Sequence, residues 1–144
     1  MRKLSSLLLI TTLILSLTLI GCSNEYEFDR VELLYSQSMN QDFNKYIEYI
    51  NDYDTYLELG YSLDDVSKST FDTHILYMYH FTNNNLGENI YLFDHYDIKN
   101  GVLNLYCKEN EDIQVSPAFG EYAMIFVIDK TLVDDANSIQ VVFE

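Results

Sequence analysis

Two segments of the chain carry apolar side chains on both of their faces. Residues 74–81 and 122–129 place aliphatic or aromatic residues at odd and at even positions alike. Successive side chains of a strand point to opposite faces, so a strand of this kind has to be covered on both sides. We therefore predict that both segments are strands and that residues 74–81 form a central one.

An Asn-Gly pair separates two further strand candidates. Residues 90–98 and 102–108 are rich in aromatic and branched apolar residues, and Asn100-Gly101 lies between them. Both residues tolerate a positive φ, which makes this pair a strong signal for a tight hairpin. Residues 139–143 are predicted to form the last strand.

The preceding part of the chain shows weaker signals, with short strand candidates at residues 31–35 and 46–50. Residues 51–60 have helical spacing, with Asn51 or Asp52 available as the N-cap and Gly60 as the stop. A further helical turn is predicted at 62–66, where Ser62 can cap.

These elements predict an α+β fold that is mainly β. It has about six strands in a mostly antiparallel sheet, with one or two short helices against one face or edge.

The N-terminus has the pattern of a targeting segment. Met1-Arg2-Lys3 is basic, and residues 4–20 contain only Leu, Ile, Ser and Thr. This pattern is typical of a secretory signal peptide, whereas a transmembrane helix needs about 20 apolar residues.

Leu19-Ile20-Gly21-Cys22, at the end of this segment, resembles the lipobox of bacterial lipoproteins. The resemblance implies that the Cys22 thiol receives a diacylglyceryl group and that the chain is cut before Cys22. The alternatives are an uncleaved anchor or an ordinary signal peptide, but the Ala-x-Ala-type site of the latter is absent.

Lipidation would place the protein on the extracytoplasmic side of the cell membrane, since acyl chains anchor a protein without spanning the bilayer. We predict a lipoprotein signal peptide at residues 1–21, a leader at residues 22–29 and a single β-rich domain at residues 30–144.

Charge narrows the range of partners. The chain has 144 residues, and residues 22–144 hold 23 acidic and six basic ones, which is a net charge of −17. Such a domain repels nucleic acid phosphates and anionic headgroups, so no nucleic acid partner is expected. The acidic surface can attract cations or basic partners, although its commoner role is solubility.

Residue sets that could catalyse a reaction are sparse. Cys107 has the parity of the apolar residues of its strand, so we expect it to be buried and inert. His74 and His80 are too far apart on one strand to share a metal, whereas His80 and His95 could meet across a ladder without an identifiable third ligand. No Gly-x-Ser-x-Gly elbow or glycine-rich phosphate loop is present. We therefore predict no catalytic residue, cofactor or metal site, and a protein that is not an enzyme.

Two segments leave a binding role open. Asp52-x-Asp54 resembles the first ligands of a calcium loop, but the other required positions do not match. Five tyrosines lie within residues 46–61, and tyrosine is favoured at interfaces because its ring has a polar end. The more common explanation is that they are core and half-buried sheet residues. The five are Tyr46, Tyr49, Tyr53, Tyr56 and Tyr61.

The order of elements between Tyr46 and Val142 resembles the PrcB-like domain of secreted bacterial proteins. An Asn-Asp-Tyr-x-x-Tyr helix start, Phe71 before an apolar strand, the Lys99-Asn100-Gly101 hairpin and the strand 122–130 carry this resemblance, which covers about two thirds of the chain. It implies a non-enzymatic accessory module that binds or stabilises other extracytoplasmic proteins, and it assigns no functional residues. The alternative is a lipoprotein that captures a small molecule, a cation or a glycan.

Overall fold

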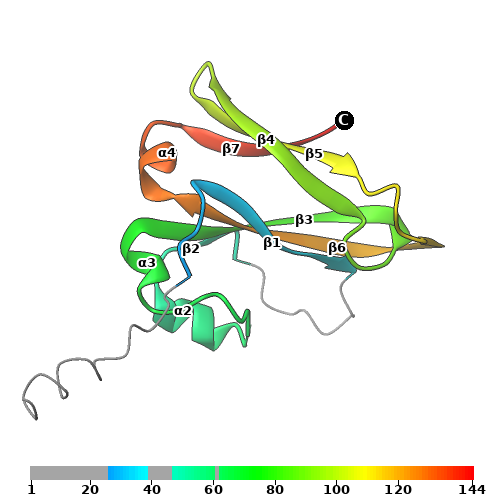
Figure 1. Ribbon diagram of the computed structural model, residues 1–144, viewed down its shortest axis with the longest axis horizontal. Helices are drawn as coiled ribbons and strands as arrows, with labels where there is room; N and C mark the ends of the chain where they lie inside the picture. Colours follow the sequence, from blue (N-terminus) through cyan, green and yellow to red (C-terminus); the bar gives the residue numbers. More distant parts are fainter. Residues whose placement is uncertain (1–25, 39–46, 61) are drawn as a thin grey trace, which may run out of the picture.

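The structure, a computed structural model, describes residues 26–38, 47–60 and 62–144, which form two β-sheets and three short helices (Figure 1). In chain order the elements are β1 (Val31–Ser38), β2 (Tyr49–Ile50), α2 (Tyr53–Glu58), α3 (Thr70–Thr73), β3 (His74–Leu86), β4 (Tyr91–Lys99), β5 (Val102–Glu109), β6 (Ser116–Asp129), α4 (Lys130–Asp134) and β7 (Ser138–Phe143). The four-stranded sheet has the order β1-β6-β3-β2, and the three-stranded sheet has the order β4-β5-β7. The predicted mainly β, mostly antiparallel α+β fold is confirmed.

The division into two sheets differs from the predicted single sheet. The chain leaves the three-stranded sheet after β5, adds β6 to the four-stranded sheet, and returns through α4 to β7. Because this crossover brings β7 back in the same direction as β5, these two strands pair in parallel. The other strand pairs are antiparallel.

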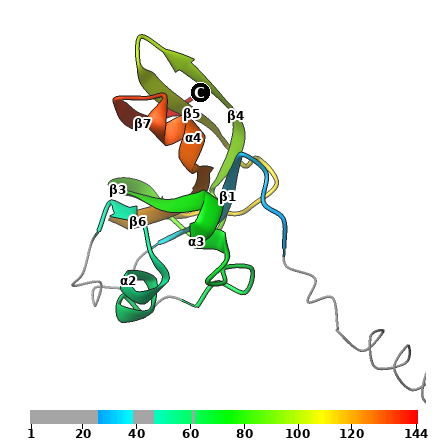
Figure 2. The same cartoon turned by 90° about the vertical axis from the view of Figure 1, so that its left-hand side faces the viewer.

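The predicted two-faced strands are the centre of the fold. From Tyr122 to Ile128 every residue of β6 is at most 1% exposed. Met124 and Phe126 pack into a core between the two sheets, whereas Ile125 and Val127 pack into a second core under α2 and α3. The layers are therefore helices, four-stranded sheet and three-stranded sheet (Figure 2).

The hydrogen bonds at the start of α2 explain where that helix begins. The side chain of Asp52 accepts a bond from the Thr55 backbone N–H at 2.8 Å and caps the helix, as an N-cap aspartate does. Gly60, two residues beyond its last turn, has a φ of +76°, so the predicted stop is also confirmed.

Two short helices differ from the prediction. Residues 62–66 do contain a turn, closed by the hydrogen bond from the Val66 N–H to the Leu63 carbonyl at 3.1 Å, but they do not form a helix. The next helix lies later, at α3, and α4 was not predicted. Both are too short to show a helical hydrophobic period. Lys130 at the start of α4 links the two helices, because its Nζ donates to the carbonyl of Phe71, the second residue of α3, at 2.6 Å.

A buried polar cluster fixes β6 to the start of β4. The Tyr122 hydroxyl lies 2.8 Å from Ser36 Oγ and accepts a hydrogen bond from the Ile90 N–H at 3.1 Å. Burial raises the pKa of Tyr122. These bonds satisfy polar groups that would otherwise be costly to bury, and they connect the two sheets.

The Asn100-Gly101 hairpin is confirmed. It joins β4 and β5, and the φ angles of its two residues are +54° and +76°. Its backbone also contacts the segment between α4 and β7, because Asn137 N–H donates to the Gly101 carbonyl at 2.6 Å. The turn therefore fixes the start of β5 relative to the start of β7.

Replacing Gly101 with Ala should lower the free energy of unfolding by about 1–2 kcal/mol, because non-glycine residues resist this backbone conformation. An added Cβ would also lie 2.5 Å from Asn137 Nδ2. Urea denaturation measures the change. Gly87→Ala is the matched control, since its Cβ would meet Ile90 at an ordinary 3.5 Å; equal stabilities of the two variants would contradict this account of the turn.

Candidate functional site

The outer face of the three-stranded sheet carries a connected set of polar side chains. Alternate residues of β5 face the core between the sheets, where Leu103, Leu105 and Cys107 are fully buried. The intervening residues Tyr106 and Lys108 therefore point to the opposite face. Because α2 and α3 lie beyond the other sheet, neither helix covers this face (Figure 2).

A β-bulge in β4 changes which residues reach this face. Phe93 pairs with Cys107 but His95 pairs with Tyr106, so Asp94 is the extra residue. Both Asp94 and His95 are exposed, although neighbours in a regular strand point to opposite faces. The bulge places a carboxylate and an imidazole side by side.

Three contacts hold this pair. Lys108 Nζ lies 2.5 Å from Asp94 Oδ1, and His95 Nδ1 lies 2.9 Å from Asp94 Oδ2. Two hydrogen bonds hold the pKa of Asp94 below its ordinary value. The bond from Lys108 has the larger effect and the bond from His95 the smaller one. The His95 ring stacks on Tyr106 with a centroid distance of 4.4 Å and an interplanar angle of 6°. Glu144 completes the group, since one ligand atom each from Asp94, His95 and Glu144 lie within 4.8 Å of one another.

A second chain of hydrogen bonds crosses the same face. Asn104 Nδ2 donates to Asp97 Oδ1 at 2.7 Å, and Gln140 Nε2 donates to Asn104 Oδ1 at 2.8 Å. Lys99 Nζ lies 2.5 Å from Asp97 Oδ2, and the bonds from Lys99 and Asn104 lower the pKa of Asp97. These contacts join all three strands, so they hold the side chains of the face in fixed positions.

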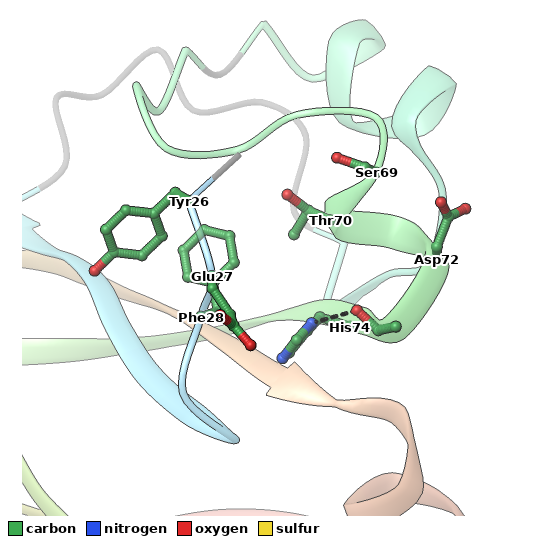
Figure 3. Close-up of a pocket in the computed structure, with 8 residues that line it drawn as sticks. Tyr26, Glu27, Phe28, Ser69, Thr70, Asp72 and His74 are labelled. Atoms are coloured by element: carbon green, nitrogen blue, oxygen red, sulfur yellow. Dashed lines mark hydrogen bonds between the residues drawn. The ribbon is translucent and has the colours of Figure 1, made fainter. Parts of the chain in front are cut away.

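A hollow of about 400 Å³ lies on the opposite side of the molecule, between residues 26–28 and α3 (Figure 3). Phe28 and His74 form part of its lining, and their rings meet edge to face at 5.9 Å. His74 Nδ1 forms a hydrogen bond with Thr73 Oγ1 at 2.8 Å. The Tyr26 hydroxyl points away from α3 and donates to Glu32 at 2.8 Å. His74 Nδ1 and the Tyr26 hydroxyl therefore already have partners within the protein.

The histidines predicted as a possible pair lie in different sheets. His80 is in β3, where its Nε2 lies 2.6 Å from Glu121 Oε2, whereas His95 is in β4. The structure therefore does not place them across a ladder. The reason is that the chain turns into the second sheet between them, after β3 ends at Leu86.

Cys107 is buried as predicted. Its side chain has no exposed surface, and burial, together with the charge of Asp94, raises its pKa to about 12. A thiol with this pKa is protonated at neutral pH and is therefore a poor nucleophile. The prediction that Cys107 is a core residue is confirmed.

The tyrosine-rich segment lies partly outside the described residues, since Tyr46 and Tyr61 fall there. Tyr56 is buried and stacks on Tyr53 at a centroid distance of 5.9 Å. Tyr49 is half-buried and contacts Tyr77. These three tyrosines pack within the fold, in agreement with the more common explanation.

The pair Asp52-x-Asp54 has a structural role at its first position. Asp52 accepts bonds from the Thr55 backbone and hydroxyl, both at 2.8 Å, and the backbone bond is the larger cause of its lowered pKa. Both aspartates, with Tyr53, line a small hollow of about 230 Å³. The carboxylate oxygens of Asp52 are already used by the helix cap.

Cys22, the predicted lipidation site, lies outside the described residues. Within the described ranges, no helix combines the length and the apolar character that crossing a bilayer requires. Comparisons of the chain with protein-family models, with curated proteins and with solved structures each find no match. Its function therefore has to be argued from its own residues.

From the sequence alone, His95 is predicted only as a possible partner of a second imidazole, and neither Asp94 nor Glu144 is singled out. The sequence does contain a signal for Asp94 and His95, because the aromatic residues lie at odd positions up to Phe93 and at an even position at Tyr96. A change of parity within one strand indicates a bulge. Glu144 had no local signal, because it reaches the site through the parallel pairing of β7 with β5.

The lowered pKa of Asp94 predicts a dependence of stability on pH. A carboxyl group whose pKa is lower in the folded state than in the unfolded state stabilises the fold at pH values above the pKa of the unfolded state, here 3.8. This stabilisation is lost as the pH falls through the pKa of the folded state. Between about pH 5 and pH 2, the melting temperature of Asp94→Asn should therefore fall less than that of the unmodified protein.

Thermal denaturation followed by circular dichroism over this pH range makes the comparison. Asp134→Asn is the control, because Asp134 is exposed and no hydrogen bond or ion pair of its side chain is found among the described residues. If Asp94→Asn and Asp134→Asn have parallel pH profiles, the contacts of Asp94 with Lys108 and His95 do not stabilise the fold.

Proposed function

We propose that this protein is a lipid-anchored, extracytoplasmic interaction module that acts by contacting another extracytoplasmic protein and catalyses no reaction. Cys22 carries the lipid in this proposal, in keeping with the Leu19-Ile20-Gly21-Cys22 motif. The β-rich domain is the part that contacts the partner.

The observation that supports a binding role is the outer face of the β4-β5-β7 sheet. Its aromatic and charged side chains are held by contacts that cross all three strands, including the His95–Tyr106 stack and the Asp97–Asn104–Gln140 chain. Fixed side chains lose little conformational entropy on binding, which favours association. Exposed Leu92, which is 40% accessible, adds an apolar contact to this polar face.

The acidic composition favours a basic surface on the partner. Residues 22–144 carry a net charge of −17, and electrostatic complementarity increases the rate at which partners associate. Such association slows as the ionic strength rises, because salt screens exposed charges.

The runner-up is a lipoprotein that captures a small ligand. The hollow beside Phe28 and His74 supports it, since its volume of about 400 Å³ lies in the range of ligand pockets. The outer sheet face has the stronger case, because its polar groups form a network that spans three strands, whereas His74 and Tyr26 each have one hydrogen bond to a residue close in sequence.

Replacement of Cys22 with Ala tests the anchor. The variant should lose its association with the membrane fraction or remain unprocessed, because alanine offers no thiol for the diacylglyceryl group. Fractionation of cells followed by immunoblotting measures both outcomes. Cys107→Ala is the matched control, since Cys107 is buried; a Cys22→Ala protein that is cut and anchored normally would rule out lipidation at Cys22.

Replacement of Leu92 with Arg tests the binding face. Crosslinking on intact cells, followed by mass spectrometry, should give a partner adduct for the unmodified protein and strongly reduced adduct for Leu92→Arg. A charged side chain in the centre of a contact has to be desolvated, which weakens binding.

Leu57→Arg is the matched control, because Leu57 is 52% exposed on α2, away from the three-stranded sheet. It should keep the adduct. Loss of the adduct with Leu57→Arg alone would assign binding to the helical side, and the absence of any adduct from the unmodified protein would count against an interaction module.

A further inference from the structure

The outer sheet face brings together three side chains with metal-ligating atoms. Asp94 and His95 come from the bulge of β4, and Glu144 directly follows β7, whose Phe143 pairs with Cys107 of β5. One ligand atom from each lies within 4.8 Å of the others. Two ligands of one ion are roughly 3.5 Å apart when each binds at about 2.1 Å. Rotation of these exposed side chains closes the remaining difference.

The surroundings orient the imidazole before any ion arrives. Tyr106 stacks on the His95 ring in nearly parallel planes, and Asp94 Oδ2 lies 2.9 Å from His95 Nδ1. The position of Glu144 is set by the backbone, because its N–H donates to the Cys107 carbonyl at 2.9 Å and continues the β5–β7 ladder. The orientation of the His95 ring and the backbone position of Glu144 are therefore set before an ion binds, which reduces the freedom lost on binding.

Among the residues that the structure describes, Lys108 is the one cation that contacts this group. Its Nζ lies 2.5 Å from Asp94 Oδ1, whereas the contact with His95 uses Oδ2. Oδ2 is therefore the Asp94 oxygen that would bind the ion, once the ion replaces the proton shared with His95 Nδ1, while Lys108 stays bonded to Oδ1. Residues 108–112 and Glu144 also line a shallow hollow that contains Glu109, Glu111 and Asp112. These carboxylates outnumber Lys108 and concentrate cations near the site.

We propose that Asp94, His95 and Glu144 bind one divalent transition-metal ion on the outer face of the three-stranded sheet. One imidazole nitrogen and two carboxylate oxygens suit the borderline ions of the first transition row, such as Zn²⁺, better than Ca²⁺, which prefers six to eight oxygens. Three protein ligands leave a coordination position open to water or to a group of a second molecule. This proposal is independent of whether the face contacts a protein partner.

Titration of the detergent-solubilised full chain with Zn²⁺ tests the site. Isothermal titration calorimetry should give one ion per chain, and NMR should show that the His95 imidazole resonances shift, with those of His74 and His80 unchanged. Binding of Zn²⁺ that shifts His74 or His80 and leaves His95 unchanged would overturn the proposal, as would the absence of binding.

Two variants of equal charge separate a coordination site from general attraction to an acidic surface. Glu144→Gln should weaken Zn²⁺ binding roughly tenfold or more, since it removes a ligand. Glu111→Gln removes the same charge from the neighbouring hollow and should change the affinity by no more than about twofold, because salt screens it. Equal weakening by both variants would overturn the proposal.

His95→Ala and a titration with Ca²⁺ test the class of ion. Loss of Zn²⁺ binding in His95→Ala and a much weaker affinity for Ca²⁺ are expected. Ca²⁺ affinity equal to that for Zn²⁺, together with unchanged Zn²⁺ binding by His95→Ala, would identify an oxygen-only site and contradict the proposal. Thermal denaturation of each variant checks that these exposed substitutions leave the fold intact.

Discussion

The burial of both faces of β6 is the constraint on which the rest of the structure depends. Met124 and Phe126 on one face, and Ile125 and Val127 on the other, are almost fully removed from solvent. Each such side chain stabilises the fold by about 1.5–3 kcal/mol relative to exposure. One face is covered by the three-stranded sheet and the other by the segment that contains α2 and α3. A strand of this kind needs a layer of structure on each of its faces, so a layered arrangement follows from its composition.

The elements that could be predicted are those whose signal is local. Alternation over 74–81 and 122–129 identified the two central strands, and Asn100-Gly101 located a hairpin because both residues favour the backbone angles that the turn requires. The division into two sheets and the parallel pairing of β5 with β7 were not predicted. These features depend on where the chain goes after each strand, and several short connections would fit the same pattern of apolar residues.

The candidate site was less predictable than the fold for the same reason. Leu19-Ile20-Gly21-Cys22 is a continuous stretch that resembles a lipobox, so Cys22 could be proposed from the sequence directly. The group of Asp94, His95 and Glu144 combines residues about 50 positions apart. Their meeting requires both the bulge in β4 and the β5–β7 ladder. Polar residues on the solvent face of a strand also have no periodic signal of their own, because such positions accept many side chains.

The packing of Phe28 has a consequence for how far the domain can reach. Phe28 is 9% exposed and belongs to the core under the four-stranded sheet, so the ordered domain already includes this residue. Only six peptide steps separate it from Cys22. At full extension this tether spans at most about 20 Å, less than the width of a small domain. If Cys22 carries the lipid, the Phe28 end is held close to the bilayer, and the protein can act only on molecules that come within about one domain's length of the membrane surface.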